Sequence, residues 1–98
     1  MSDQEIIPLE TYCSYYHVEL EFIHTLEEFG LLHISYQEAK GFIQKEDVAE
    51  LERFSRLHYD LNINVPGIDA LQHLLEKVRS LQQETQALRN RLKIYEQE

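Results

Sequence analysis

The chain has 98 residues, a net charge of −9 and a single cysteine, and these properties exclude several classes of protein. So short a chain forms one small unit in which a deep substrate pocket is hard to build, so an enzyme is not expected. Cys13 cannot form an intramolecular disulfide, and we expect neither a secretory signal nor an apolar run of the roughly 18 residues that a membrane span needs. These features predict a cytoplasmic protein.

The charge is unevenly distributed along the chain. Residues 1–39 contain no Lys or Arg, and their acidic residues are Asp3, Glu5, Glu10, Glu19, Glu21, Glu27, Glu28 and Glu38. Nucleic-acid binding draws most of its affinity from Lys and Arg side chains that neutralise phosphates. The N-terminal half is therefore expected to repel DNA and to attract a basic protein surface.

The first predicted elements are a short extended segment and two helices. Ile6–Pro8 reads as a strand or entry segment, and a first helix is predicted over Leu9–Tyr16, with a turn at His17. A second helix runs from about Glu19 to Phe29 and ends at Gly30, a residue favoured after helix C-termini. Its apolar spacing gives two possible buried stripes: Leu20, Ile23 and Leu26, or Phe22, Leu26 and Phe29.

A small hairpin and a third helix follow. Residues 32–36 and 41–43 alternate around a polar, glycine-containing link, which predicts two short strands. The third helix spans about Lys45 to Asp60 and ends at the turn-forming run Asn62–Gly67. A long final helix is expected to open at Ile68 or Asp69, which divides the chain into a globular part, 1–67, and a C-terminal helix, 68–98.

The final helix carries apolar residues that are spaced alternately three and four positions apart. This heptad pattern predicts a coiled coil whose seam is Leu71, Leu74, Val78, Leu81, Thr85, Leu88, Leu92 and Tyr95. A seam this long and narrow needs a second helix, so we expect a homodimer. The alternative is a monomer whose helix folds back on its own domain. Charged residues beside the seam allow ion pairs in either orientation and do not decide between parallel and antiparallel pairing.

Several smaller clusters have both a structural and a functional interpretation. Packing is favoured over metal binding for Cys13, His17 and His24, because structural zinc normally uses paired ligand motifs twice over. No metal or cofactor site is therefore expected, and no catalytic motif is present. Two further groups read either as packed or exposed helix faces or as binding contacts: the aromatic group Tyr12, Tyr15 and Tyr16, and the group Arg53, Arg56, His58 and Tyr59.

The run Arg53–Ile68, together with the leucines that follow it, resembles a known family. Its arginine–leucine stretch, acidic–leucine pair and Asn-x-x-Gly-Ile turn, and the leucine-rich helix after them, resemble the MerR-like superfamily and in particular the bacterial chaperone-modulator proteins. The resemblance implies a mainly α, winged helix-turn-helix fold with a small β-hairpin wing and a C-terminal coiled-coil helix that pairs antiparallel. It also implies binding to the J-domain of the curved-DNA-binding co-chaperone, which suppresses both the co-chaperone's partnership with Hsp70 and its DNA binding.

An alternative function is that of a MerR-like transcription regulator that binds DNA. In such proteins the second helix enters the major groove and needs outward-facing Arg, Lys, Asn or Gln. Here that helix instead offers four carboxylates, which we predict to be the partner-binding residues: Glu19, Glu21, Glu27 and Glu28. Two other interpretations stay open, a merely solvated acidic face and a dimerisation adaptor with an unknown client.

Overall fold

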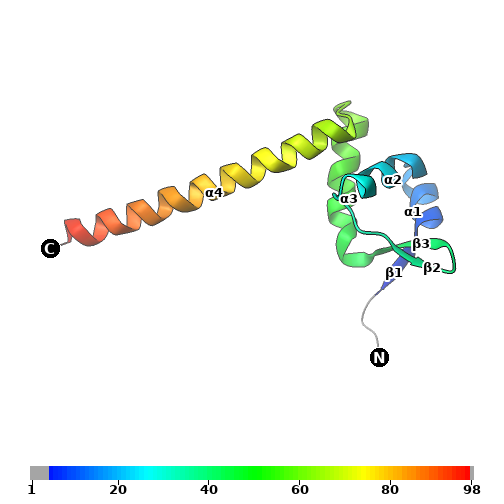
Figure 1. Ribbon diagram of the computed structural model, residues 1–98, viewed down its shortest axis with the longest axis horizontal. Helices are drawn as coiled ribbons and strands as arrows, with labels where there is room; N and C mark the ends of the chain where they lie inside the picture. Colours follow the sequence, from blue (N-terminus) through cyan, green and yellow to red (C-terminus); the bar gives the residue numbers. More distant parts are fainter. Residues whose placement is uncertain (1–4, 98) are drawn as a thin grey trace.

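The protein consists of a globular end and one long helix that projects away from it (Figure 1). The structure, a computed structural model, describes residues 5–97, so the predicted acidic start with Asp3 and the last residue of the predicted coiled coil, Glu98, lie outside the described residues. Over residues 5–97, no helix is both long enough and apolar enough to cross a membrane. The predicted mainly α fold with a small sheet and a long C-terminal helix is confirmed.

Two helices joined by a tight turn begin the globular end. Helix α1 (Leu9–Tyr16) follows strand β1 (Ile6–Pro8) directly, at the bounds that the sequence predicts. His17 takes a left-handed conformation with φ of 58°, and α2 (Leu20–Glu28) then runs to the turn at Gly30, whose φ is +74°. The turn therefore sets α2 at an angle to α1, as in a helix-turn-helix.

The sheet has one strand more than the predicted hairpin. Strands β2 (Ser35–Gln37) and β3 (Lys40–Gln44) pair antiparallel, and β1 pairs with the other edge of β3, so that the strand order is β1-β3-β2. The hairpin turn is made by Glu38 and Ala39, both with positive φ. The link is shorter than predicted, because Gln37 and Lys40 belong to the strands, and Gly41 lies within β3. The first strand begins at Ser35, three residues later than predicted.

The third helical segment is one continuous run of three conformations. A 3₁₀ turn, η1 (Lys45–Asp47), leads into α3 (Val48–Ser55), which passes into a π-helical turn, η2 (Arg56–Asp60). The final helix, α4 (Val65–Glu96), then begins three or four residues earlier than predicted. The Asn64 side chain caps it by accepting a hydrogen bond from the Gly67 amide at 2.9 Å. Pro66 and Gly67 are thus part of the first turn, where a missing amide hydrogen and a flexible backbone are tolerated.

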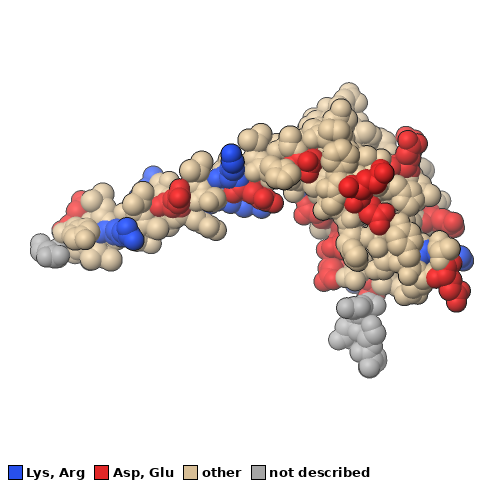
Figure 2. Space-filling view, viewed as in Figure 1, with Lys and Arg blue, Asp and Glu red and all other residues tan. Residues whose placement is uncertain are grey.

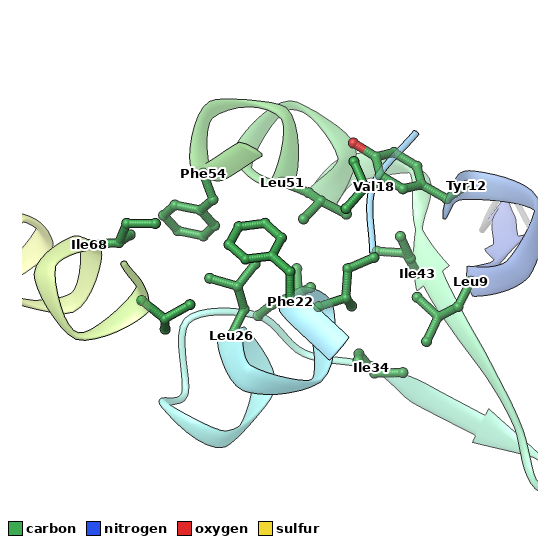
Figure 3. Close-up of a cluster of buried hydrophobic side chains, with 13 residues drawn as sticks. Leu9, Tyr12, Val18, Phe22, Leu26, Ile34, Ile43, Leu51, Phe54 and Ile68 are labelled. Atoms are coloured by element: carbon green, nitrogen blue, oxygen red, sulfur yellow. The ribbon is translucent and has the colours of Figure 1, made fainter. Parts of the chain in front are cut away.

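The core lies where α1, α2, α3, β3 and the start of α4 meet (Figure 3). The buried side chains of α2 are Phe22, Ile23 and Leu26, so each predicted stripe was partly right. Leu20 and Phe29 remain exposed. Val65 and Ile68 of α4 are buried in the same core, which anchors the long helix to the globular end.

Candidate protein-binding surface

The second helix of the pair presents carboxylates on its outer side. Because Phe22, Ile23 and Leu26 face the core, the opposite side of α2 faces solvent. Glu21 and Glu28 are exposed and lie seven residues apart, two helical turns, so they share this outer side. Glu19 is also exposed, immediately before the first turn. Three of the four predicted partner-binding carboxylates therefore face solvent at the beginning and end of α2.

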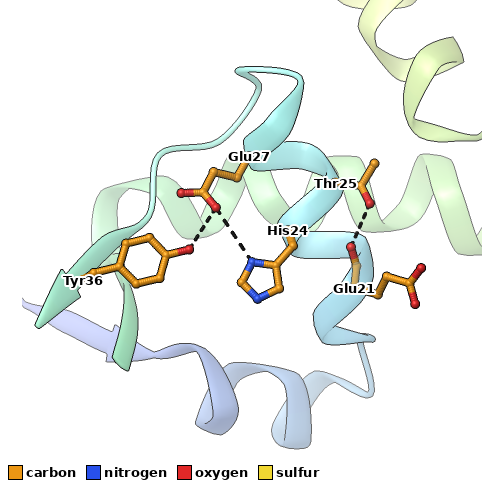
Figure 4. A network of polar contacts seen from close by, with 5 residues as sticks. All are labelled: Glu21, His24, Thr25, Glu27 and Tyr36. Atoms are coloured by element: carbon orange, nitrogen blue, oxygen red, sulfur yellow. Dashed lines mark hydrogen bonds and ion pairs between the residues drawn. The ribbon is translucent and has the colours of Figure 1, made fainter. Parts of the chain in front are cut away.

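The fourth carboxylate, Glu27, is turned toward the hairpin (Figure 4). Its Oε1 accepts a hydrogen bond of 2.9 Å from the Tyr36 hydroxyl on β2, and His24 Nδ1 lies 3.8 Å from the same oxygen. The bond to Glu27 raises the pKa of Tyr36, since the carboxylate stabilises the protonated phenol. Glu27 thus joins α2 to the wing, whereas Glu21 points away from it.

An aromatic contact fixes the beginning of α2. The Phe22 ring stacks on the His58 ring with centroids 4.4 Å apart, and Tyr59 meets both rings edge-on. The Tyr59 hydroxyl accepts a hydrogen bond of 3.0 Å from the Glu19 amide, and His58 Nδ1 lies 2.9 Å from the Ile63 carbonyl oxygen. Sequence reasoning did not find this link, because its residues lie about 40 positions apart in the chain.

Arg53 and Arg56, for which a binding contact is one of two interpretations, form no ion pair with the acidic half of the chain within residues 5–97. Arg53 forms an ion pair with Glu50 of its own helix and donates a hydrogen bond of 2.8 Å to Gln72 of α4. Arg56 is exposed. Arg53 therefore connects α3 to the long helix.

The net charge of the protein belongs to its globular end. Residues 1–64 hold thirteen of the eighteen acidic residues and four of the nine basic ones, so they carry the entire charge of −9, while residues 65–98 hold five of each. Figure 2 shows acidic residues gathered over the globular end and most of the visible basic residues along the long helix. Within residues 5–97, no Lys or Arg forms an ion pair with Glu19, Glu21 or Glu28.

The aromatic group of α1 divides between core and surface. Tyr12 is 2% exposed, and burial, with the Glu52 carboxylate nearby, raises its pKa to about 12. The ring of Tyr16 packs on that of Tyr12 with centroids 4.5 Å apart, and the exposed Tyr15 ring meets it edge-on. Cys13 is half-buried, and burial raises the pKa of its thiol. In the described part of the chain, no three His, Cys, Asp or Glu side chains lie together as metal ligands would.

The predicted dimer seam lies on α4, mostly clear of the globular end. Leu71 is half-buried near the core, and the rest of the seam, from Leu74 onward, is exposed: Leu74, Val78, Leu81, Thr85, Leu88, Leu92 and Tyr95. The Thr85 hydroxyl donates to the Leu81 carbonyl oxygen at 2.8 Å, so this polar side chain of the seam is satisfied by its own helix. The helix does not fold back on the domain, which argues against that alternative (Figure 1).

This architecture matches a known family of proteins over most of the chain. The family model described as MerR HTH family regulatory protein matches residues 7–90, which include both helices of the pair, the wing and most of α4. The chain belongs to the MerR HTH family of regulatory proteins. No curated protein and no solved structure gave a significant match. This MerR-family chain therefore combines a helix-turn-helix architecture with carboxylates on the outer side of its second helix.

Proposed function

We propose that this MerR-family protein is a cytoplasmic, non-catalytic chaperone modulator that binds the J-domain of a co-chaperone. It would occlude the basic J-domain helix that docks on Hsp70, and would thereby block both that partnership and the co-chaperone's DNA binding. The observation that carries the proposal is the outer side of α2, where Glu19, Glu21 and Glu28 stand in solvent with no basic partner in residues 5–97. Such a surface attracts a basic helix and repels phosphates.

The proposed active form is a homodimer through α4. An isolated helix with exposed leucines at heptad spacing is unfavourable in water, and a second copy supplies the same apolar stripe. The antiparallel orientation follows from the resemblance to MerR-like proteins. Paired this way, the two acidic globular ends would lie at opposite ends of the coiled coil, each free to bind one J-domain.

The rival function, a DNA-binding transcription regulator, is supported by the helix-turn-helix architecture and the family match. Its difficulty is electrostatic: a major-groove helix with Glu21 and Glu28 outward brings carboxylates toward phosphates. A titration of labelled duplex DNA at physiological salt separates the two functions. We expect no saturable binding of DNA, and tight binding without any affinity for a J-domain would favour the rival.

A binding titration against an isolated J-domain tests the proposal directly. We expect saturable binding that weakens steeply as salt rises, because screening shortens the range of the attraction to about 10 Å at 0.1 M. The double variant Glu21→Lys with Glu28→Lys should weaken binding at least about fivefold at low salt, since it reverses two charges at the contact.

The matched control reverses two exposed carboxylates elsewhere, Glu46→Lys with Glu76→Lys, and so changes the net charge by the same amount. This control should bind the J-domain within about twofold of the unmodified protein, because charges away from the contact are largely screened. Equal losses in both double variants would show that net charge, not the α2 surface, drives association. Absence of any J-domain binding would overturn the proposed function itself.

A further inference from the structure

A groove separates the acidic helix from the wing. It lies between α1, α2 and the β2–β3 hairpin, has a volume of about 430 Å³, and is here termed the hairpin groove. Its apolar lining includes Leu20 of α2, Tyr36 of β2 and Phe42 of β3. A cavity of this size falls within the range of about 300–1,000 Å³ typical of ligand pockets.

The apolar side chains of the hairpin groove remain accessible in the folded chain. Leu20 is 41% exposed and Tyr36 is 52% exposed. Because Phe22, Ile23 and Leu26 of α2 face the core, Leu20 lies outside the core and lines the groove beside the wing. Exposed apolar surface in a concavity is unfavourable in water and is typical of a contact site.

Polar and charged side chains border the groove, and carboxylates of α2 lie beside it. Glu10 and His24 line it, and the Glu27 carboxylate is held beside it by the Tyr36 hydroxyl. Within residues 5–97, Lys40 is the one Lys or Arg side chain in the lining. Glu21 and Glu28 extend the acidic surface along the adjoining side of α2. An apolar floor beside carboxylates complements a helix that carries an apolar anchor flanked by Lys or Arg.

We infer that the hairpin groove binds an apolar anchor side chain of a cationic amphipathic helix, whose basic residues meet the carboxylates of α2. The inference rests on the proposed function and deepens it, since it gives the basic helix of the partner an apolar contact beside the electrostatic one. Charge alone attracts many basic surfaces, whereas the anchor selects a helix with an apolar residue at the correct position. Hot spots of protein interfaces usually consist of such buried anchors.

The test uses two synthetic helical peptides of equal positive charge and the full chain. One peptide carries leucines at i, i+3 and i+7 on a single face, and the other carries serine at those positions. We expect the leucine peptide to bind about tenfold more tightly. A leucine side chain that leaves water on binding contributes favourably to the binding free energy, and serine lacks this contribution. Equal affinity of the two peptides would overturn the inference.

The variant Leu20→Gln tests whether the groove is the contact. It should weaken binding of the leucine peptide by about five- to tenfold, because a polar side chain replaces part of the apolar floor. The matched control is Leu61→Gln, at an exposed leucine in the turn after η2 and outside the groove. It should leave binding within about twofold, which also separates the groove from other exposed apolar residues. Equal affinity of Leu20→Gln and the unmodified protein would overturn the inference.

Amide chemical-shift mapping of the unmodified protein with the leucine peptide gives a second measurement that does not depend on the variant folding. Shifts should cluster at residues of α1, α2 and the hairpin, and a cluster confined to α4 would overturn the inference. An isolated J-domain then separates the two proposals. A peptide in the groove without J-domain binding contradicts only the proposed function, while J-domain binding that Leu20→Gln leaves unchanged contradicts only the groove.

Discussion

Asn64 determines where the long helix begins. Its side chain accepts a hydrogen bond from the Gly67 amide, one of the helix's first amides that have no partner within the helix. We predict that Asn64→Ala lowers the free energy of unfolding by about 1 kcal/mol, whereas Asn64→Ser, which can cap in the same way, costs less. Urea denaturation at one fixed protein concentration measures both variants. Equal losses for Ala and Ser would show that the cap is not the cause.

The same residue explains a limit of sequence reasoning. The run Asn62–Gly67 contains the residues that usually break helices, and the sequence therefore predicted a turn throughout. The structure uses Pro66 and Gly67 inside the first helical turn, because Asn64 satisfies an amide there. By contrast, α1 was predicted with its observed bounds. The residues that delimit it, Pro8 before it and His17 after it, are its immediate neighbours in the sequence.

At the scale of elements, the β2–β3 wing packs closely against α1 at Gly41 of β3. A Cβ atom at this position would lie 2.6 Å from Leu9 Cδ1 and 3.2 Å from Ile34 Cγ2, and both of those side chains are buried. We predict that Gly41→Ala lowers the free energy of unfolding by about 1–3 kcal/mol, because Leu9 must leave its packed position.

A double-mutant cycle checks this cause. Combining Gly41→Ala with Leu9→Ala should cost less than the sum of the two single changes, since the truncated side chain leaves space for the new methyl group. Gly30→Ala is the control: its φ of +74° makes any side chain costly, but nothing lies within 4 Å of its Cβ position. Its cost should therefore add to that of Leu9→Ala, and additivity in both pairs would contradict the packing explanation.

The sequence did not predict the contacts between elements that lie far apart in the chain. The pairing of β1 with β3 joins Ile7 to Ile43, more than thirty residues apart, and no local pattern indicates it. The hairpin groove has the same origin, since Leu20 and Phe42 line one groove only after the wing is in place. The acidic side of α2 was predictable because it depends on helical spacing and composition alone, although Glu27 turned out to be bound to Tyr36.

At the scale of the whole molecule, the chain is far from compact. Its radius of gyration is 18.9 Å, whereas a compact domain of this length has about 13 Å. The excess comes from α4, whose seam residues from Leu74 onward stand in solvent. A helix of this kind gains stability chiefly by packing its apolar side. In the single chain, the apolar side of α4 from Leu74 onward has no packing partner.

We therefore predict that the protein is a dimer in solution and that Leu81→Glu with Leu88→Glu makes it a monomer. The two carboxylates would face each other across the seam and lose the apolar contact that drives pairing. The control, Gln83→Glu with Asn90→Glu, adds the same charge on the outer side of the helix and should remain dimeric. Sedimentation equilibrium over a range of micromolar concentrations distinguishes the two masses. A monomeric unmodified protein, or a monomeric control, would contradict the seam, and the α2 surface would then act from a single globular end.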